Sequence, residues 1–456
     1  MIDLEAPRAV RWICKTLEEA GYPTWAVGGA VRNRLAGRSA EDWDLTTRAE
    51  PKIVRRLFRR TVPIGVDHGT VGVLAHDGTM NEVTTFRRDV ETTGRHAVVA
   101  FAETLDEDLA RRDFTINAVA WHPLERRLHD PFGGAADLER GLLRTVGNPT
   151  DRFAEDYLRI LRALRFAGTF RLQIEPPTWR ALVRAVPGMD VLSPERVREE
   201  LEKVLSGLER PSAALSLYAA SGSLSFLYPE LDRQVGRADG VVADRWSHLL
   251  RVVDQLLPKE VELRWAALLM GIGTDPEEPA EMLGGGEPDL ATMVAAAELL
   301  RRLRSSNARV DRVGTLVGWV TRFPSADASD VELRRWVAGV GRGHLPDVLR
   351  LRRAIATVRG LEGNADETDR FTRLAPRLRE IARSDVPLEV GELAFSGRDL
   401  IRMGQRPGPY FGDLLRHLLQ WVIEAPSRNR TETLAEEARV WLTEFERDSP
   451  DTGEGP

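Results

Sequence analysis

The sequence predicts an α/β head followed by an all-α neck, body and tail. From about residue 20 to residue 150, short β-type runs alternate with helical segments and tight turns. After Pro149, apolar residues recur at the three- and four-residue spacing of packed helices up to about residue 440. At 456 residues the chain is too long for a single core, which suggests about three to four domains.

Changes in this pattern set the expected domain boundaries. Loops between helical groups are expected at the glycine run 284–286 and at 322–325. The final segment is polar and rich in small residues, which predicts disorder. We expect a head at 1–148, a neck at 149–210, a body at 211–385, a tail at 386–448 and a disordered end at 449–456.

Composition narrows the class of protein. The 42% hydrophobic and 29% charged residues are typical of a soluble globular chain. A single cysteine, Cys14, excludes an internal disulfide framework, and neither a signal peptide nor an apolar run of membrane-spanning length is visible. These features predict a cytoplasmic protein with no membrane partner, and no protein partner is evident. A net charge of −6 confines any RNA contact to local basic patches.

The first elements of the head surround a glycine turn. Residues 25–27 predict a short buried strand that ends at Gly28 and Gly29, where missing side chains let a ligand approach the backbone. The helix opening at Val31 would favour phosphate at its amino end, although an ordinary strand-to-helix connection would look the same. Further strands are expected at 71–74, 82–86 and 98–101, with a turn at 76–79.

Two groups of charged residues follow in the head. Asp42 and Asp44 share one face if they lie in a strand, so they could hold a pair of hard cations that clamp a triphosphate. The alternative is an ordinary acidic loop. Arg111-Arg112-Asp113 could bind phosphates and a ribose hydroxyl, with Phe114 and Ile116 pointing into a core if the stretch is extended. A surface ion pair is the alternative for this group.

A third charged group lies on a helix predicted over residues 151–169. A solvated, salt-bridged face is the ordinary explanation of such a pattern. Alternatively, a carboxylate and a guanidinium three positions apart, Asp156 and Arg159, could offer acceptors and donors to the edge of a nucleobase. The charged face contains Arg152, Glu155, Arg159 and Arg162, and the opposite side contains Tyr157, Ile160, Leu161 and Leu164.

In their order and spacing, these motifs resemble the class II tRNA nucleotidyltransferases and bacterial poly(A) polymerases. The resemblance covers about residues 20–205 and returns in the tail. It implies a polymerase β-like nucleotidyltransferase head. One departure is Asn33, which stands where the family usually has aspartate and removes a charge. The matching segments are Gly28 to Asn33, Asp42 with Asp44, Arg111 to Ala118, the hinge-like segment 130–138, and Glu155-Asp156 with Arg159.

The resemblance implies a template-independent enzyme that adds CMP and AMP from CTP and ATP to the 3′ end of tRNA. In such an enzyme, the 3′-hydroxyl of the RNA attacks the α-phosphorus of the nucleotide in line, with two Mg²⁺ ions in the site. Asp42 and Asp44 would be catalytic metal ligands, with Glu82 as support. The nucleotide-binding residues would be Gly28, Gly29, Arg32, Arg111, Arg112, Asp113, Asn117, Asp156, Arg159, Arg162 and Arg165, with Glu155 as support; Asp156 and Arg159 would read the base.

The body and tail carry weaker signals. Many relatives have a metal-binding histidine-aspartate module, but Met270 and Gly271 replace its ligands here, so we expect 244–280 to be a degenerate module and His248 a packed or surface residue. Segments 395–400 and 407–412 resemble the tail that contacts the tRNA elbow, although glycine and proline there also suit helix ends. The candidate RNA phosphate contacts are Arg398, Arg402, Arg406 and Arg416.

The product is less determined than the class of reaction. Family members add the whole CCA end, only CC, only A, or poly(A). The segment Phe86 to Phe101 occupies the place of the loop that helps the switch from CTP to ATP, which favours competence for the A step. A non-catalytic RNA-binding protein is opposed by the retention of Asp42, Asp44 and the base-reading motif. A small-molecule nucleotidyltransferase of the aminoglycoside type would not need the long helical remainder.

Overall fold

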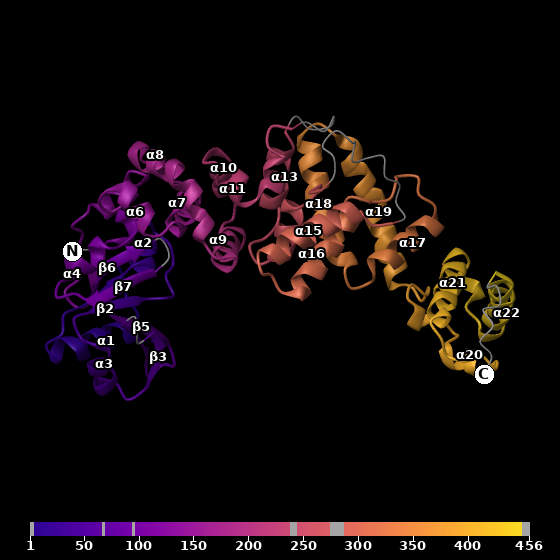
Figure 1. Ribbon diagram of the computed structural model, residues 1–456, viewed down its shortest axis with the longest axis horizontal. Helices are drawn as coiled ribbons and strands as arrows, with labels where there is room; N and C mark the ends of the chain where they lie inside the picture. Colours follow the sequence, from indigo (N-terminus) through magenta and orange to yellow (C-terminus); the bar gives the residue numbers. More distant parts are fainter. Residues whose placement is uncertain (1–3, 66–68, 94–95, 238–243, 274–286, 449–456) are drawn as a thin grey trace. The chain divides into compact units, whose positions relative to one another are not determined.

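A computed structural model describes residues 4–65, 69–93, 96–237, 244–273 and 287–448. The chain forms two compact units, Met1–Asp232 and Arg233–Pro456 (Figure 1). The expected α/β head and helical remainder are confirmed, whereas the four-part division stays a prediction. The predicted disordered end and the glycine run 284–286 lie outside the described residues.

A seven-stranded mixed sheet forms the centre of the head, in the order β3-β4-β5-β2-β1-β8-β9. Strand β1 pairs antiparallel with β2 and β8, and β2 runs parallel to β5. The predicted strands are therefore confirmed to within two residues of their ends. The strands are β1 (Thr24–Val27), β2 (Asp44–Thr47), β3 (Thr61–Gly65), β4 (Thr70–Leu74), β5 (Met80–Thr85), β8 (Ala120–His122) and β9 (Arg127–His129); β6 (Arg87–Thr93) and β7 (His96–Phe101) form a separate hairpin.

The two faces of this sheet differ because successive strand residues point to opposite sides. On one face, Leu45 and Val83 join an apolar core with Val10 and Ile13 of helix α1 (Arg8–Glu19) and with residues of α3 (Pro51–Leu57). The residues at alternate positions of β2 and β5 are polar and line a cleft on the other face. The alternation thus leaves a polar sheet surface uncovered for a ligand.

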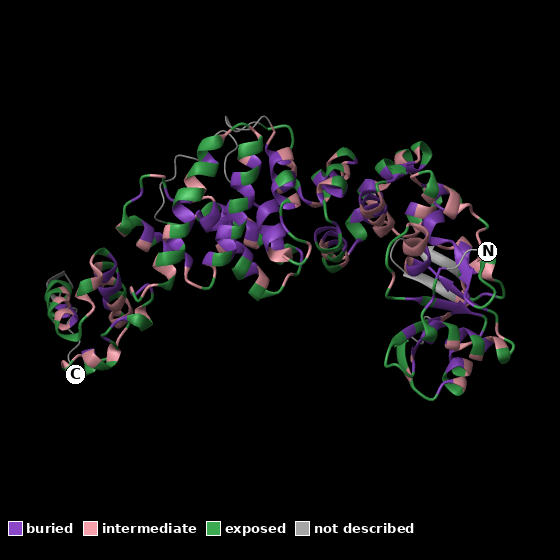
Figure 2. Ribbon diagram, turned by 180° about the vertical axis from the view of Figure 1, so that it is seen from behind, coloured by how far each residue is buried: buried purple, intermediate pink, exposed green. Residues whose placement is uncertain are grey.

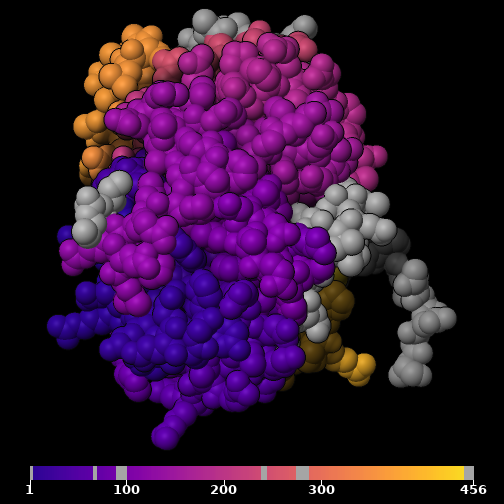
Figure 3. Space-filling model, turned by 90° about the vertical axis from the view of Figure 1, so that its left-hand side faces the viewer, coloured from indigo at the N-terminus to yellow at the C-terminus, as the bar shows by residue number. Residues whose placement is uncertain are grey.

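Helices and short strands complete the first unit. In the space-filling view of Figure 3, the head and the helices that follow it form one continuous surface. These elements are α2 (Gly29–Leu35), α4 (Leu105–Ala110), η2 (Thr115–Asn117), α5 (Gly134–Glu139), β10 (Leu142–Leu143), α6 (Pro149–Glu155), α7 (Leu158–Phe170), β11 (Gln173–Ile174), α8 (Pro176–Ala185), η3 (Val186–Val191), α9 (Pro194–Gly207), α10 (Ser212–Ala220), α11 (Ser223–Leu227) and α12 (Pro229–Asp232).

The prediction of a single helix over 151–169 is wrong, because the helix is interrupted between α6 and α7. Asp156 has extended backbone angles of φ −153° and ψ 106°. Its Oδ1 accepts a hydrogen bond from the backbone N–H of Leu158 at 3.0 Å. The extended backbone at Asp156 ends α6, and its side chain satisfies the backbone donor of the first residue of α7.

The second unit is built from helices. Its helix α16 contacts α15 and α18, and the ribbon of Figure 2 is coloured purple where the residues of this unit are buried. None of the helices within the described ranges is long and apolar enough to cross a membrane. The elements are α13 (Arg245–Asp254), α14 (Val261–Leu268), α15 (Leu290–Arg302), α16 (Asn307–Val320), α17 (Asp330–Val340), α18 (Leu345–Leu361), α19 (Ala365–Arg383), η4 (Val390–Glu392), α20 (Gly397–Arg402), α21 (Tyr410–Glu424), η5 (Pro426–Arg428) and α22 (Thr431–Asp448).

His248 is a packed helix residue, as predicted. Its Nδ1 lies 2.9 Å from Oε2 of Glu362, and the imidazole is buried. Met270 is buried and lies beyond the end of α14. Within the described part of the chain, no three or more histidine, cysteine, aspartate or glutamate residues form a group that could hold a metal ion.

Candidate active site

A cleft of about 570 Å³ lies between the polar face of the sheet and the neck helices α7 and α9. It contains every predicted site residue of the head and neck except Asp42 and Glu155. The predicted residues that line it are Gly28, Gly29, Arg32, Asp44, Glu82, Arg111, Arg112, Asp113, Asn117, Asp156, Arg159, Arg162 and Arg165.

An acidic corner forms the sheet side of this cleft. Asp44 is the first residue of β2 and pairs with Val27, whereas Asp42 precedes the strand, so the expectation that both carboxylates lie in the strand is wrong. Both are exposed and flank the buried Trp43, so they lie on the side away from the core. Glu82 precedes Val83, which pairs with Leu45, and this register makes Glu82 a neighbour of Asp44.

The acidic corner carries uncompensated negative charge. Desolvation raises the pKa of Asp44 above its ordinary value, and the charges of Glu82 and Asp42 raise it further, against the opposing effect of Arg112. Among the described residues, no cationic side chain forms an ion pair with Asp44. A Cβ added to Gly28 would lie 3.3 Å from Nη1 of Arg112 and 3.4 Å from Oδ2 of Asp44, so the glycine preserves the space at this corner.

Two arginines that line the cleft share one buried acid. Nε of Arg111 donates to Oδ1 of Asp108 at 3.1 Å, and Nη2 of Arg112 donates to Oδ2 at 3.2 Å. Burial alone would raise the pKa of Asp108, but the two guanidinium groups lower it below its usual value. Sequence reasoning missed Asp108, although its spacing of three and four residues from the arginines is a helical pairing signal.

Asp113 is held by three donors on the floor of the cleft. Its Oδ2 accepts from Nε of Arg162 at 2.7 Å, and its Oδ1 accepts from the Asn117 amide at 2.8 Å and from the backbone N–H of Phe114 at 2.9 Å. Burial alone would raise the pKa of Asp113, but Arg162 and these hydrogen bonds lower it to about 2. Phe114 and Ile116 are buried as expected. Phe114 is extended, with φ −126° and ψ 150°, whereas Ile116 lies in the 3₁₀ helix η2.

Arg32 is held by neutral partners. Its Nη1 donates to Oδ1 of Asn117 at 2.5 Å, and its Nη2 donates to Oδ1 of Asn33 at 3.0 Å. The guanidinium lies over Phe166 and Phe170, 4.7 and 4.8 Å from their ring centres. Burial and then the charge of Arg165 lower the pKa of Arg32 to about 10. Asn33 therefore offers Arg32 a neutral amide at the position where the family's usual aspartate would offer a negative charge.

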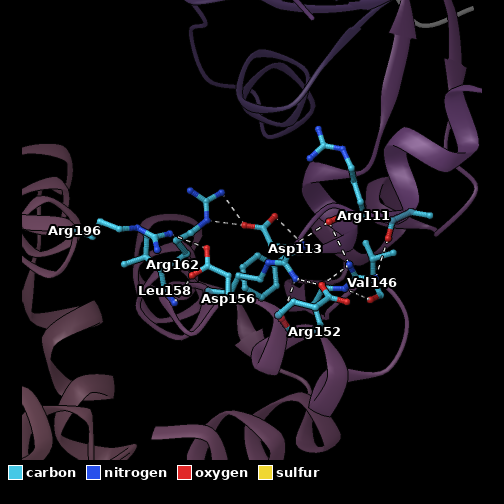
Figure 4. Close-up of polar contacts among 12 residues, drawn as sticks. Arg111, Asp113, Val146, Arg152, Asp156, Leu158, Arg162 and Arg196 are labelled. Atoms are coloured by element: carbon cyan, nitrogen blue, oxygen red, sulfur yellow. Dashed lines mark hydrogen bonds and ion pairs between the residues drawn. The ribbon is translucent and has the colours of Figure 1, made fainter. Parts of the chain in front are cut away.

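The neck places charged groups at the break between α6 and α7 (Figure 4). Oδ2 of Asp156 accepts from Nη2 of Arg196 at 2.8 Å. Glu155 stays outside the cleft lining because its carboxylate holds Arg159 and Arg152, which is consistent with a supporting position. Arg196 lines the cleft but was missed by sequence reasoning, because it lies on α9 and no local spacing connects it to Asp156.

Comparisons with known proteins agree with this geometry. The Poly A polymerase head domain matches residues 24–144, and the "Probable RNA and SrmB- binding site of polymerase A" matches residues 171–235. The CCA-adding enzyme of Geobacillus kaustophilus is 33% identical over 443 residues, covering 95% of this chain and 96% of that protein. The CCA-adding enzyme of Limosilactobacillus fermentum is 31% identical over 431 residues, covering 94% and 95%.

Solved structures give the same result. The crystal structure of the Bacillus stearothermophilus CCA-adding enzyme in complex with CTP superposes with a TM-score of 0.71 at 29% identity, covering 96% of this chain and 98% of that one. The Thermotoga maritima CCA-adding enzyme complexed with tRNA shares the fold, with a TM-score of 0.56 at 22% identity over 95% and 94% of the chains.

Fold, cleft and matches together define a nucleotidyltransferase with a mixed-sheet head and a helical remainder. Within that class, the identity along nearly its whole length shows that the chain belongs to the CCA-adding enzyme family. The resemblance seen in the sequence motifs is thereby confirmed.

Proposed function

We propose that this protein adds cytidylate and adenylate from CTP and ATP to the 3′ end of tRNA in the cytoplasm. The observation that carries the proposal is one cleft in which an unpaired acidic corner, Asp44 with Glu82, faces a set of arginines. Such a cleft suits a triphosphate and its counter-ions. The family membership supplies the tRNA end as the acceptor, since the relatives at 33% and 31% identity are named as CCA-adding enzymes.

The acidic corner is suited to hold Mg²⁺ through Asp44 and Asp42, with Glu82 close by. Its fit rests on the carboxylate of Asp44, with which no described cation forms an ion pair, and on hard carboxylate oxygens, which Mg²⁺ prefers. The described carboxylates form no three-ligand group, so substrate phosphates and water would complete the coordination. Bound there, the ions would supply charge neutralisation and acidify the attacking hydroxyl.

The arginines around the cleft provide the remaining functions. Arg32, Arg111 and Arg112 would bind the triphosphate, and Arg162 and Arg165 would hold phosphates from the neck side. Asp113, kept ionised by Arg162, has Asn117 as a second polar partner near the expected sugar position. Asp156 and Arg159 at the start of α7 would read the amino and acceptor groups of cytosine or adenine.

Complete CCA addition is favoured over the narrower products. The β6–β7 hairpin is present in the position of the loop that helps the switch to ATP, and the family members compared above carry the name of the complete activity. A-only, CC-only and poly(A) activities are the alternatives. The retained cleft argues against a non-catalytic RNA-binding protein.

A primer-extension experiment tests the proposal directly. Three tRNA transcripts, ending at the discriminator base, at C and at CC, are incubated with the protein and Mg²⁺ and offered CTP, ATP or both. Extension of all three to CCA is the expected result. Extension of only the CC-ended transcript, a stop at CC, or a long A ladder would each assign one of the narrower products, and no extension would overturn the enzymatic assignment.

A further inference from the structure

A second hollow, which we name the rear pocket, lies beside the nucleotide cleft. It measures about 330 Å³ and is lined by the carboxyl-terminal parts of α7 and α9 and by residues at the end of α2. Arg32, Arg165 and Phe166 line both cavities and form the wall between them. Arg38 and Lys203 line only the rear pocket.

The rear pocket has an excess of positive charge. Four cationic side chains line it, Arg32 and Arg165 from the shared wall together with Arg38 and Lys203. The acid that contacts this group is Glu200, which accepts from Arg165 and from Lys203, both at 2.8 Å. The carboxyl ends of α7 and α9 each add about half a negative charge, and Thr169 O accepts from Arg38 at 2.5 Å. A net charge of about +2 remains after these contributions.

The cations in this pocket also crowd one another. Burial is the main cause that lowers the pKa of Arg32, and the charges of Arg165, Arg162 and Arg38 lower it further, against the opposing charge of Asp113. Asn33, which stands beside Arg32 in the same pocket, offers only an amide oxygen. Arg32 and Arg165 are partly buried, whereas Arg38 and Lys203 are exposed at the rim of the pocket. An anion with several acceptor oxygens would relieve the repulsion among these cations.

The aromatic residues of the pocket indicate the chemical class of the anion. Phe170 lies against Arg32 and Arg38, at 4.8 and 4.7 Å, and Phe166 lies against Arg165 at 4.4 Å. Because guanidinium groups cover these rings, the pocket offers donors and charge in place of a stacking surface for a base.

We propose that the rear pocket is an anion site for a phosphate group, adjoining the nucleotide cleft through Arg32 and Arg165. The phosphate has two possible sources, a backbone phosphate of the RNA substrate or the pyrophosphate released by transfer. This inference rests on the proposed function for its sources, but its binding chemistry comes from the pocket alone.

The test removes charge at residues outside the nucleotide cleft. Arg38→Gln and Lys203→Gln are compared with Arg180→Gln, which removes an exposed arginine of α8 that lines neither cavity. Inorganic pyrophosphate and CTP are titrated separately by calorimetry in EDTA. If the pocket binds the product, the Kd for pyrophosphate rises about tenfold in the two pocket variants while the Kd for CTP stays within about twofold.

The second arm measures tRNA affinity over a range of salt concentrations. If an RNA phosphate occupies the pocket, the pocket variants bind tRNA more weakly, and the slope of log affinity against log salt falls by about one. Weaker binding of pyrophosphate or of tRNA by the pocket variants, with unchanged binding by Arg180→Gln, supports the anion site. The ligand that is affected identifies the source of the phosphate. Unchanged pyrophosphate and tRNA binding in both pocket variants would overturn it.

Two further variants separate charge from folding. Asn33→Asp adds an acid beside Arg32, which lines both cavities, so it should weaken binding of the same anion and also of CTP. Arg38→Lys keeps the charge and should retain binding. These measurements need no turnover, so a protein that binds the anion but extends no tRNA would contradict the proposed function and leave the anion site intact.

Discussion

Arg196 of α9 holds the carboxylate of Asp156 at the break between α6 and α7. Its Nη2 lies 2.8 Å from Oδ2 of Asp156, while the other carboxylate oxygen accepts the backbone N–H of Leu158 at 3.0 Å. Two anchors from different elements therefore fix the orientation of the acid that we expect to read the base. We therefore expect Arg196 to be a positioning residue for nucleotide selection.

Arg196→Met should weaken this selection. Without the guanidinium, one oxygen of Asp156 loses its anchor, so discrimination of CTP and ATP against UTP and GTP should fall by about tenfold or more. The measurement is kcat/KM for each of the four nucleotides on a CC-ended and a C-ended tRNA. Arg198→Met is the matched control, because Arg198 lies on the same helix and pairs with Glu202 outside the cleft. Equal discrimination in both variants would limit Arg196 to a structural role.

Asp44→Asn should abolish metal-dependent activity without damaging the fold. The neutral amide is a weaker ligand for Mg²⁺, and the loss of several kcal/mol of charge stabilisation corresponds to a fall of about a thousandfold in rate. Mg²⁺ should raise the melting temperature of the wild type and have a smaller effect on the variant. An equal Mg²⁺-dependent shift in both proteins would place the ion elsewhere.

The effect of Asp44→Asn on stability should also depend on pH, in a direction that the pKa of Asp44 determines. The folded-state pKa of Asp44 is raised, so the folded protein loses stability as the pH rises from 3.8 through that raised value. Asp44→Asn lacks this penalty. In EDTA at pH 7 the variant should therefore melt at or above the wild-type temperature, and the difference should shrink toward pH 4. Thermal scans over this range measure it, and a variant that melts well below the wild type at pH 7 would contradict the unpaired acidic corner.

Local patterns in the sequence were enough to predict the head, because its signals are short in range. The strand 25–27, the turn at Gly28 and the carboxylate of Asp44 follow from alternation and turn chemistry. The break at Asp156 was not predicted, because the helical spacing of apolar residues continues on both sides of it. A local hydrogen bond from the backbone N–H of Leu158 to the side chain of Asp156 competes with helix continuation there.

Residues that act across elements were the ones missed. Arg196 and Glu200 lie on α9, and they reach Asp156 and Arg165 only after the neck has folded. The spacing of residues along the chain does not predict contacts between elements that are distant in sequence. Asp108 is different, since its pairing with Arg111 and Arg112 lies within one helical turn and the sequence did contain that signal.

Asp113→Asn should destabilise the first unit in a pH-dependent way. Because the folded-state pKa of about 2 lies below the ordinary 3.8, the charged form adds stability above pH 4, and this stability is lost as the pH falls from 3.8 toward 2. The shift corresponds to about 2 kcal/mol. Urea unfolding of wild type and variant at pH 7 and at several values down to pH 3 should show a difference that narrows with acidity. If the difference in free energy of unfolding stayed constant with pH, the ion pair between Asp113 and Arg162 would not be its cause.

The exposed arginines of the tail provide a separate prediction about RNA. Arg402 lies on α20 and Arg416 on α21, and both side chains reach solvent beside the apolar core around Leu400 and Leu414. Changing Arg398, Arg402, Arg406 and Arg416 to glutamine should weaken binding of full-length tRNA. The slope of log affinity against log salt should also fall by about one for each arginine that binds a phosphate.

The same quadruple variant should still extend a minimal RNA hairpin that ends in CC, because the nucleotide cleft belongs to the first unit. The comparison is kcat/KM on full-length tRNA and on the hairpin. Arg353→Gln, which removes an exposed arginine of α18, is the control for a general decrease in positive charge. An equal decrease on both substrates would show that the tail arginines act through folding, and no decrease on either would remove them from the RNA surface.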